Sequence, residues 1–417
     1  MSAPSAPAPF TVSLCMIVKN EERYLRGCLE SARPFVDEIV IVDTGSTDTT
    51  VGIAQEFGAV IRTFPWNGNF SDARNESLRH ATGDWILYLD ADERLMNGDA
   101  LRQLRPSAQT VAYNVSISSK HILPSGTVDQ VNQYQRFFRR HPKIRFEGVV
   151  HEQVLPSLLR MNKRIEDSPL FIEHLGYGES LEKIQQKCER NAALLRRQLE
   201  LNPHDYYAHY QLGNTLGVML RYDEAEKHLR LAVEHDRNVS IRASACNILV
   251  ETAMHRNDLE SAERWCRQSV KLVPVQVMGH WFLSGILAHR QQYDEALRSI
   301  DTMRSNAGRP TGLAHDLQVP EGEINYRTIV CYEGLANAAM AASDLARAHL
   351  LVTSAEERGI RSPKLQTIGI QTAMALNDLD TALRRIDFML RNLPPDAESQ
   401  RARFRAVRSR IESMAVA

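Results

Sequence analysis

Four short apolar runs near the start of the chain recur at regular spacing, and each is followed directly by polar residues. The runs are Val12–Val18, Glu38–Val42, Val60–Phe64 and Trp85–Leu89. They have the length and composition of β-strands, and the segments between them are helix-like and about 10–15 residues long. This alternation of strand and helix predicts an α/β domain with a mostly parallel, Rossmann-like sheet.

Polar side chains follow the carboxyl ends of these predicted strands. Ligands of open parallel sheets bind outside that edge. We therefore expect Asn20, Asp43, Trp66, Asp90 and Asp92 to converge on one crevice. The crevice is rich in carboxylates, which suits a divalent metal ion bound together with an anionic ligand.

Two common nucleotide-binding motifs are missing from the sequence. A dinucleotide fold would carry Gly-x-Gly-x-x-Gly after the first strand, where this chain has Lys19–Glu22, and no P-loop motif occurs anywhere. The remaining feature is Asp90-Ala91-Asp92 at a strand end. Alternation along an extended chain puts the two aspartates on one side, where they can hold Mg²⁺ or Mn²⁺ beside phosphate oxygens.

The second half of the chain has a different pattern, with Ala, Leu, Arg and Glu at helical spacing. Similar short blocks end in alanines whose numbers differ by 37, 34, 52 and 34, namely Ala225, Ala262, Ala296, Ala348 and Ala382. A unit of about 34 residues is the tetratricopeptide period, so we predict five such repeats. The longer step fits extra residues within Ser305–Glu323.

Composition limits the cellular setting and the partners. The 417 residues carry 50 basic and 51 acidic side chains, a net charge of −1, so nothing attracts nucleic acid globally. The six cysteines have no C-x-x-C spacing and indicate thiols in a reducing cytoplasm. No stretch approaches the ~20 apolar residues of a membrane span. Met1–Pro9 is expected to be a disordered tail, and any contact with a lipid-linked acceptor would be peripheral.

The motifs together resemble the family 2 glycosyltransferases, inverting enzymes of the GT-A fold that use nucleotide-sugar donors. The resemblance rests on Ser13–Asn20, Ile39–Asp48, Phe70–Asn75 and Leu87–Glu93, and it covers about the first 175 residues. With its helical repeats the chain is most similar to a bacterial subgroup that includes peptide S- and O-glycosyltransferases of the sublancin-synthase type.

The resemblance implies roles for residues of the donor site. Asp43 would accept a hydrogen bond from the nucleobase, usually uracil, while Val18, Asn20 and Glu21 would line the base and ribose. Arg74 would lie near the diphosphate and stabilise the leaving group.

The resemblance also implies a metal site and a catalytic base. Asp90, with Ala91, would face the ribose or the metal, and Asp92 would be the firmest metal ligand. Phe146–Glu152 resembles the family's Gly-x-x-His-Glu block. Because a hydroxyl acceptor must lose its proton, we take Glu152 as the base and His151 as a metal or phosphate contact, with the reverse assignment open.

Structural alternatives exist for most of these residues. Asp43 could cap the following helix, Arg74 could lie on a solvated face of a helix over Asp72–His80, and His151-Glu152 could be an ordinary loop pair. Trp66 could belong to the core instead of forming a sugar platform.

Further basic residues and one histidine lie later in the domain. Arg136, Arg139, Arg140 and Arg145 could form a basic patch for the diphosphate or acceptor, or could be solvated charges. His174, near the domain end, is a weaker candidate for the site.

The predicted organisation is a tail (1–10), a GT-A domain (11–178), a connecting helix (179–204) and tetratricopeptide-like repeats (205–412). The predicted activity is metal-dependent, inverting transfer of a sugar from a nucleotide-sugar, UDP-sugars above all, to a peptide, protein or saccharide. The repeats would set acceptor choice or homodimer contacts, or would serve as scaffold. The alternatives are an inactive interaction protein and a nucleotidyltransferase, although the latter normally carries a Gly-rich phosphate loop after the first strand.

Overall fold

The computed structural model describes residues 10–123, 126–175, 181–309, 311, 313, 316 and 319–416. The chain divides into two compact units. The first comprises Met1–Thr252 with Gly312–Gln318, and the second comprises Ala253–Thr311 with Val319–Ala417. The predicted boundary at residue 178 lies outside the described residues, and the one at residue 204 lies within the first compact unit, so both stay predictions.

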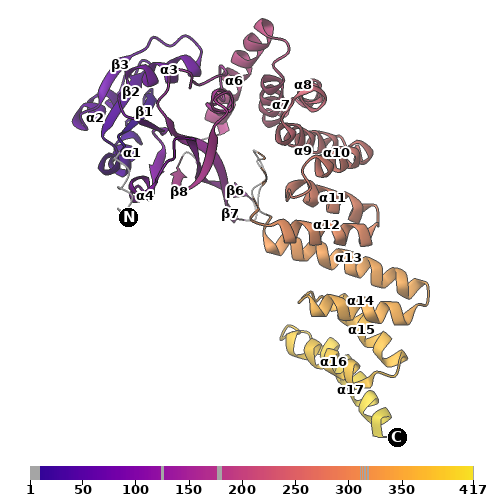
Figure 1. The fold of residues 1–417 in the computed structure, drawn as a ribbon. Coiled ribbons are helices and arrows are strands. Elements are labelled where there is room, and N and C mark those ends of the chain that lie inside the picture. Colours follow the sequence, from indigo (N-terminus) through magenta and orange to yellow (C-terminus); the bar gives the residue numbers. More distant parts are fainter. Residues whose placement is uncertain are drawn as a thin grey trace, which may run out of the picture. The chain divides into compact units, whose positions relative to one another are not determined.

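The first unit contains a mixed sheet, which runs in the order β3-β2-β1-β4-β7-β6-β8-β5 within the described residues (Figure 1). Its strands are β1 (Val12–Val18), β2 (Glu38–Asp43), β3 (Val60–Thr63), β4 (Trp85–Tyr88), β5 (Glu93–Leu95), β6 (Thr110–Leu123), β7 (Gly126–Arg139) and β8 (Arg164–His174). The helices between them are α1 (Leu25–Ala32), α2 (Thr50–Glu56), α3 (Phe70–His80), α4 (Asp99–Gln103) and α5 (Leu155–Leu159).

All four predicted strands are present, and they pair in parallel as expected. β3 pairs with β2, β2 with β1, and β1 with β4, so the carboxyl ends of these strands lie at one edge. β7 then joins β4 in antiparallel orientation and makes the sheet mixed. The predicted α/β GT-A class is confirmed.

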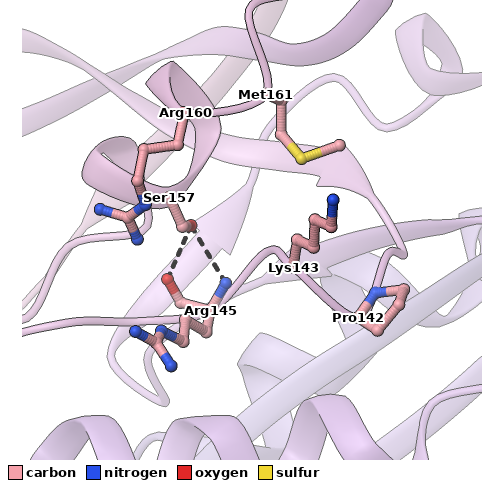
Figure 2. Close-up of a pocket in the computed structure, with 6 residues that line it drawn as sticks. All are labelled: Pro142, Lys143, Arg145, Ser157, Arg160 and Met161. Carbon is pink, nitrogen blue, oxygen red and sulfur yellow. Dashed lines mark hydrogen bonds between the residues drawn. The ribbon is translucent and has the colours of Figure 1, made fainter.

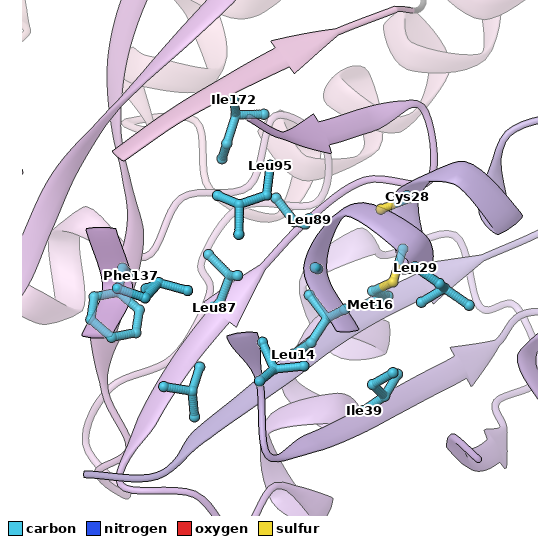
Figure 3. Packing of buried hydrophobic residues seen from close by; sticks show 14 of the residues in the cluster. Leu14, Met16, Cys28, Leu29, Ile39, Leu87, Leu89, Leu95, Phe137 and Ile172 are labelled. Carbon is cyan, nitrogen blue, oxygen red and sulfur yellow. The ribbon is translucent and has the colours of Figure 1, made fainter. Parts of the chain in front are cut away.

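The core occupies both faces of the sheet because successive strand residues point to opposite sides. Leu14 and Ile39 pack with Leu29 of α1 on one face (Figure 3). Their neighbours Cys15 and Val40 belong to the core of the other face. The parallel strands are therefore apolar without alternation, as is typical of strands covered on both faces.

Helices follow the sheet to the end of the chain. They are α6 (Leu181–Leu201), α7 (Tyr206–Val218), α8 (Tyr222–His235), α9 (Val239–His255), α10 (Leu259–Leu272), α11 (Met278–His289), α12 (Tyr293–Asn306), α13 (Glu321–Ala341), α14 (Leu345–Glu357), α15 (Pro363–Ala375), α16 (Leu379–Asn392) and α17 (Glu398–Val416). None of these described helices is long and apolar enough to span a membrane.

The repeat alignment corresponds to a repeated turn between paired helices. Helices α8, α10, α12, α14 and α16 each begin two residues after a residue with left-handed backbone, at φ of 58–61°. These residues are Leu220, Asn257, Gln291, Ser343 and Asn377. At each turn the next N–H donates to a carbonyl five residues earlier, as in a Schellman helix end.

The aligned alanines are all fully buried, which explains why the repeat needs a small residue there. The 52-residue step contains a longer connection between Asn306 and Glu321, and also a helix α13 of 21 residues where α11 has 12. The extra residues are thus divided between a loop and a helix. The sequence pattern predicts all of them within Ser305–Glu323.

Two histidines pack against each other between α7 and α8. The Nδ1 atoms of His209 and His228 lie 2.8 Å apart, and His209 Nε2 lies 3.1 Å from the Pro203 carbonyl oxygen. At this distance only one of the two Nδ1 atoms can carry a proton, and the other accepts the hydrogen bond. Burial, together with interactions with His209 and Arg196, lowers the pKa of His228 to about 4.

We expect this histidine pair to make stability depend on pH. An unfolded histidine has a pKa of about 6.5, so the unfolded chain binds more protons than the folded protein between about pH 6.5 and pH 4. The stability that His228 contributes is therefore present above about pH 6.5, and it is lost as the pH falls toward about 4. Urea unfolding at several pH values should show a shallower acid loss for His228→Gln than for wild type. The control His289→Gln, at an exposed position, should retain the wild-type slope.

Candidate active site

The loops after β1 and β2 are joined by side-chain hydrogen bonds. Asn20 has left-handed backbone at φ 56°, and its side-chain oxygen accepts from the Thr47 N–H at 2.8 Å. Its own N–H donates to the Ser46 hydroxyl at 3.0 Å. Two of the predicted polar clusters therefore form a single surface at the carboxyl edge of the sheet.

Asp43 lies at the end of β2 and is 6% exposed. Its carboxylate accepts from the N–H groups of Gly45 and Ser46, at 3.2 and 3.1 Å. The first N–H of α2 is capped instead by Asp48, at 3.0 Å from Thr50 N. The loop backbone thus orients Asp43 without using it as the cap of the helix.

Arg74 is the centre of the site. Its guanidinium donates from Nε to Glu152 and, at 2.7 Å, to Asp90. The side chain lies across the rings of Tyr88 and Phe146, at 5.1 and 5.5 Å from their centroids. Arg74 is only 8% exposed, so the alternative of a solvated helix face is wrong.

A second arginine completes this buried charge cluster. Arg136 of β7 donates to Glu93 at 2.7 Å and to Asp90 at 3.4 Å. Burial would raise the pKa of Asp90, but the charges of Arg74 and Arg136 outweigh it and hold the pKa well below its usual value. Glu93 is fully enclosed, and burial raises its pKa to about 7 despite Arg136.

Asp92 has a different partner from Asp90. His174, at the end of β8, lies with Nε2 3.0 Å from Asp92 Oδ2. Burial lowers the pKa of His174, and the hydrogen bond with Asp92 outweighs that effect, so the pKa is raised overall. Both side chains are somewhat under one-third exposed. The sequence indicated His174 only as a weaker candidate, and the structure places it in contact with Asp92.

The predicted His-Glu block forms a short closed loop. Glu147 and Gln153 exchange backbone hydrogen bonds at 2.9 and 3.0 Å. Between them, Gly148 and His151 have left-handed backbone at φ 100° and 55°. This turn directs Glu152 toward Arg74, where its side chain is 9% exposed, while His151 is exposed.

The first turn of α3 holds the same loop from one side. The Phe70 N–H donates to the Val149 carbonyl at 2.9 Å, and the Ser71 hydroxyl donates to the Gly148 carbonyl at 2.5 Å. Trp66, just before this helix, is half-buried with its ring edge-on to Phe70 at 4.7 Å. This contact is consistent with Trp66 as a core residue and also with Trp66 as a platform for the sugar.

The predicted basic patch does not form, because its four arginines have different partners. Arg136 belongs to the buried cluster, Arg139 donates to the carbonyls of residues 107 and 110, and Arg140 donates to the Gly83 carbonyl. Arg145 pairs with Glu147.

A pocket of about 370 Å³ lies between the segments around Arg145 and Ser157 (Figure 2). Its lining residues are Pro142, Lys143, Arg145, Ser157, Arg160 and Met161. No predicted catalytic or donor residue lines it. The candidate functional site is instead the cluster of carboxylates around Arg74 and Arg136.

Comparison with known proteins identifies the family of the chain. The sequence profile of glycosyl transferase family 2 matches residues 13–163. A TPR repeat-containing protein of Synechococcus elongatus is 34% identical over 309 residues, covering 69% of this chain and 75% of that protein. The prophage-derived glycosyltransferase SunS of Bacillus subtilis is 28% identical over 229 residues, covering 54% of each, so the chain spans about half of SunS.

Among solved structures, Staphylococcus aureus TarS 1–349 aligns with 63% of this chain and 91% of its own, with a TM-score of 0.32 and 13% identity. The fold and the sequence relatives define a glycosyltransferase with a GT-A-like domain. The chain belongs to glycosyl transferase family 2, with tetratricopeptide-like repeats after the catalytic domain. The nucleotidyltransferase alternative is therefore set aside.

We predict that Arg74 is required for stability as well as for the site. Arg74→Met would leave Asp90 and Glu152 without their shared partner, and breaking a buried ion pair costs about 3–5 kcal/mol. Chemical denaturation should show a loss of this size in the free energy of unfolding.

The matched control is Arg79→Met on the same helix, whose side chain is 70% exposed. Its surface ion pair is worth about 1 kcal/mol or less. Equal losses in the two variants would contradict the role of the buried cluster.

Proposed function

We propose that the enzyme transfers one sugar, with inversion and in the presence of Mg²⁺ or Mn²⁺, from a UDP-sugar to a peptide, protein or saccharide. The observation that carries this proposal is the meeting of Asp90 and Glu152 on Arg74. These carboxylates come from the end of β4 and from a loop about 60 residues later. Family membership supplies the reaction class, and this geometry supports one site for donor and base.

The nucleoside would lie against the ends of β1 and β2. Val18 and Asp43 are register partners there, and Asn20 and Glu21 continue the surface. Asp43 is held by two backbone N–H groups, and the remaining lone pairs of its carboxylate can accept from the base. The partial exposure of Asn20 and Glu21 is compatible with contact to the ribose.

A divalent metal fits beside Asp92. Among the described residues no group of three or more His, Cys, Asp or Glu could hold a metal. Mg²⁺ is, however, typically bound by one or two carboxylates together with substrate phosphates. Asp92 and His174, which pair with each other, could supply oxygen and nitrogen ligands, whereas both oxygens of Asp90 accept from Arg74 and Arg136. When bound, the ion would neutralise charge developing on the diphosphate.

Arg74 would then act mainly by binding the carboxylates of Asp90 and Glu152. Both of its hydrogen bonds go to carboxylates, which already offset its charge. We assign it to positioning Asp90 and Glu152, and direct contact with the diphosphate stays a prediction. Asp90, held rigidly and charged, would orient the ribose or a metal-bound water.

Glu152 is the proposed base. Arg74 contacts its Oε1, so Oε2 is the atom that would accept the acceptor proton. In an inverting reaction the acceptor oxygen attacks the anomeric carbon while the bond to the diphosphate oxygen breaks. The proton passes from the acceptor to Glu152, and the electron pair leaves with the nucleoside diphosphate. His151 in the same loop remains the second candidate.

Removal of the metal should abolish turnover. We expect excess EDTA, or Asp92→Ala, to reduce hydrolysis of UDP-, GDP- and dTDP-sugars nearly to background, with Mn²⁺ or Mg²⁺ restoring only the wild type. Thermal unfolding should show an intact fold in the variant. Asp99→Ala, an exposed acid of the same unit, is the control. Full activity in EDTA would refute metal dependence.

Replacement of the base should affect chemistry instead of donor binding. Glu152→Gln keeps the size of the side chain but cannot take the proton, so kcat should fall by about 10²–10⁴-fold with little change in donor KM. Asp43→Ala should show the opposite pattern, a raised donor KM, because it removes binding common to ground and transition states. A large loss of donor affinity in Glu152→Gln would place this residue in the donor site.

The repeats are proposed to contribute the acceptor side or a homodimer contact. Paired helices of this type stack to form extended faces that commonly bind peptides or another subunit. This agrees with a peptide or protein acceptor, and a saccharide acceptor remains the alternative.

A further inference from the structure

Helix α6 contacts the loop that carries Glu152. Gln198 Oε1 accepts from the Val149 N–H at 2.9 Å, while Gln198 Nε2 donates to Asp205 at 2.6 Å. Asp205 in turn caps the first turn of α7 by accepting from the Ala208 N–H at 3.0 Å. A continuous set of hydrogen bonds therefore connects the loop backbone to the start of the first repeat.

Helix α7 contacts the same loop on the other side of Glu152. The Gln153 side-chain amide donates to the Tyr207 hydroxyl at 2.7 Å, and Gln211 donates to the same hydroxyl at 2.6 Å. Burial raises the pKa of Tyr207, and the nearby charge of Glu152 adds to this effect. The hydroxyl consequently stays neutral and lies close to the proposed base.

The loop is held by one pair of backbone hydrogen bonds of its own and by contacts from neighbouring helices. Between the paired residues Glu147 and Gln153 it has two left-handed positions. The first turn of α3 binds it at residues 148 and 149, before Glu152. Beyond Glu152, the Gln153 side chain donates to the Tyr207 hydroxyl of α7. Helices α3 and α6 thus hold the loop before Glu152, and α7 holds it after Glu152.

We propose that Tyr207 and Gln198 are positioning residues for catalysis, which hold Glu152 on Arg74 from the first helices of the repeat region. This inference rests on the proposed role of Glu152 as base. In this proposal α6 and α7 take part in positioning the catalytic base. The helical region would therefore contribute to catalysis as well as to acceptor binding.

The first test measures the loop directly in the full-length protein without any ligand. In hydrogen-exchange mass spectrometry, Tyr207→Phe and Gln198→Met should each increase exchange in peptides covering residues 146–153 by about tenfold or more. The matched control is Tyr206→Phe, because that hydroxyl lies 3.3 Å from His204 and is not bonded to the loop. Unchanged exchange in both test variants would overturn the inference.

The second test separates positioning from a general loss of structure. With the sugar nucleotide that wild type hydrolyses fastest, Tyr207→Phe should reduce kcat by about 10- to 100-fold and leave donor KM nearly unchanged. In a Glu152→Gln background the same change should alter kcat by less than about twofold, because its effect passes through Glu152. Equal losses in the two backgrounds would show a merely structural role.

The outcomes also separate this inference from the proposed function. Wild-type turnover in Glu152→Gln would overturn the role of Glu152 and the inference with it. Impaired turnover in Glu152→Gln, together with normal kcat in both Tyr207→Phe and Gln198→Met, would overturn the inference alone.

Discussion

The double ion pair of Arg74 is the interaction on which the site depends. A buried guanidinium loses its hydration, and only well-placed carboxylates can compensate for that loss. Asp90 and Glu152 provide this compensation from two separate elements, and the rings of Tyr88 and Phe146 cover the guanidinium faces. The same contact therefore fixes the end of β4, the first turns of α3 and the His-Glu loop relative to one another.

This constraint separates the two aspartates of the Asp-x-Asp motif. Asp90 accepts from the buried arginines Arg74 and Arg136, whereas Asp92 pairs with His174. Equivalent spacing along the chain therefore does not mean equivalent chemistry. Asp90 is suited to fixing the positions of the arginines in the site, and Asp92 is suited to binding a metal ion together with the donor.

The catalytic domain and the repeats are less independent than their sequence patterns suggest. The first compact unit extends to Thr252 and includes α6, α7 and α8. Gln198 and Tyr207 from these helices bind the loop around Glu152. A short GT-A-like domain can thus obtain part of its support from helices that, by their periodicity, belong to a different fold type.

The sequence by itself determined the elements that depend on local patterns. The apolar runs predicted the strands β1 to β4 and their parallel orientation, and the spacing of alanines such as Ala225 predicted the repeats, because periodicity and residue size act within one element. Only the tertiary structure decided which side chains meet. Arg74 with Glu152, Asp92 with His174, and Tyr207 with Gln153 are each more than 50 residues apart. Such partners are set by the convergence of whole elements and by the need to satisfy buried charge, which no local pattern records.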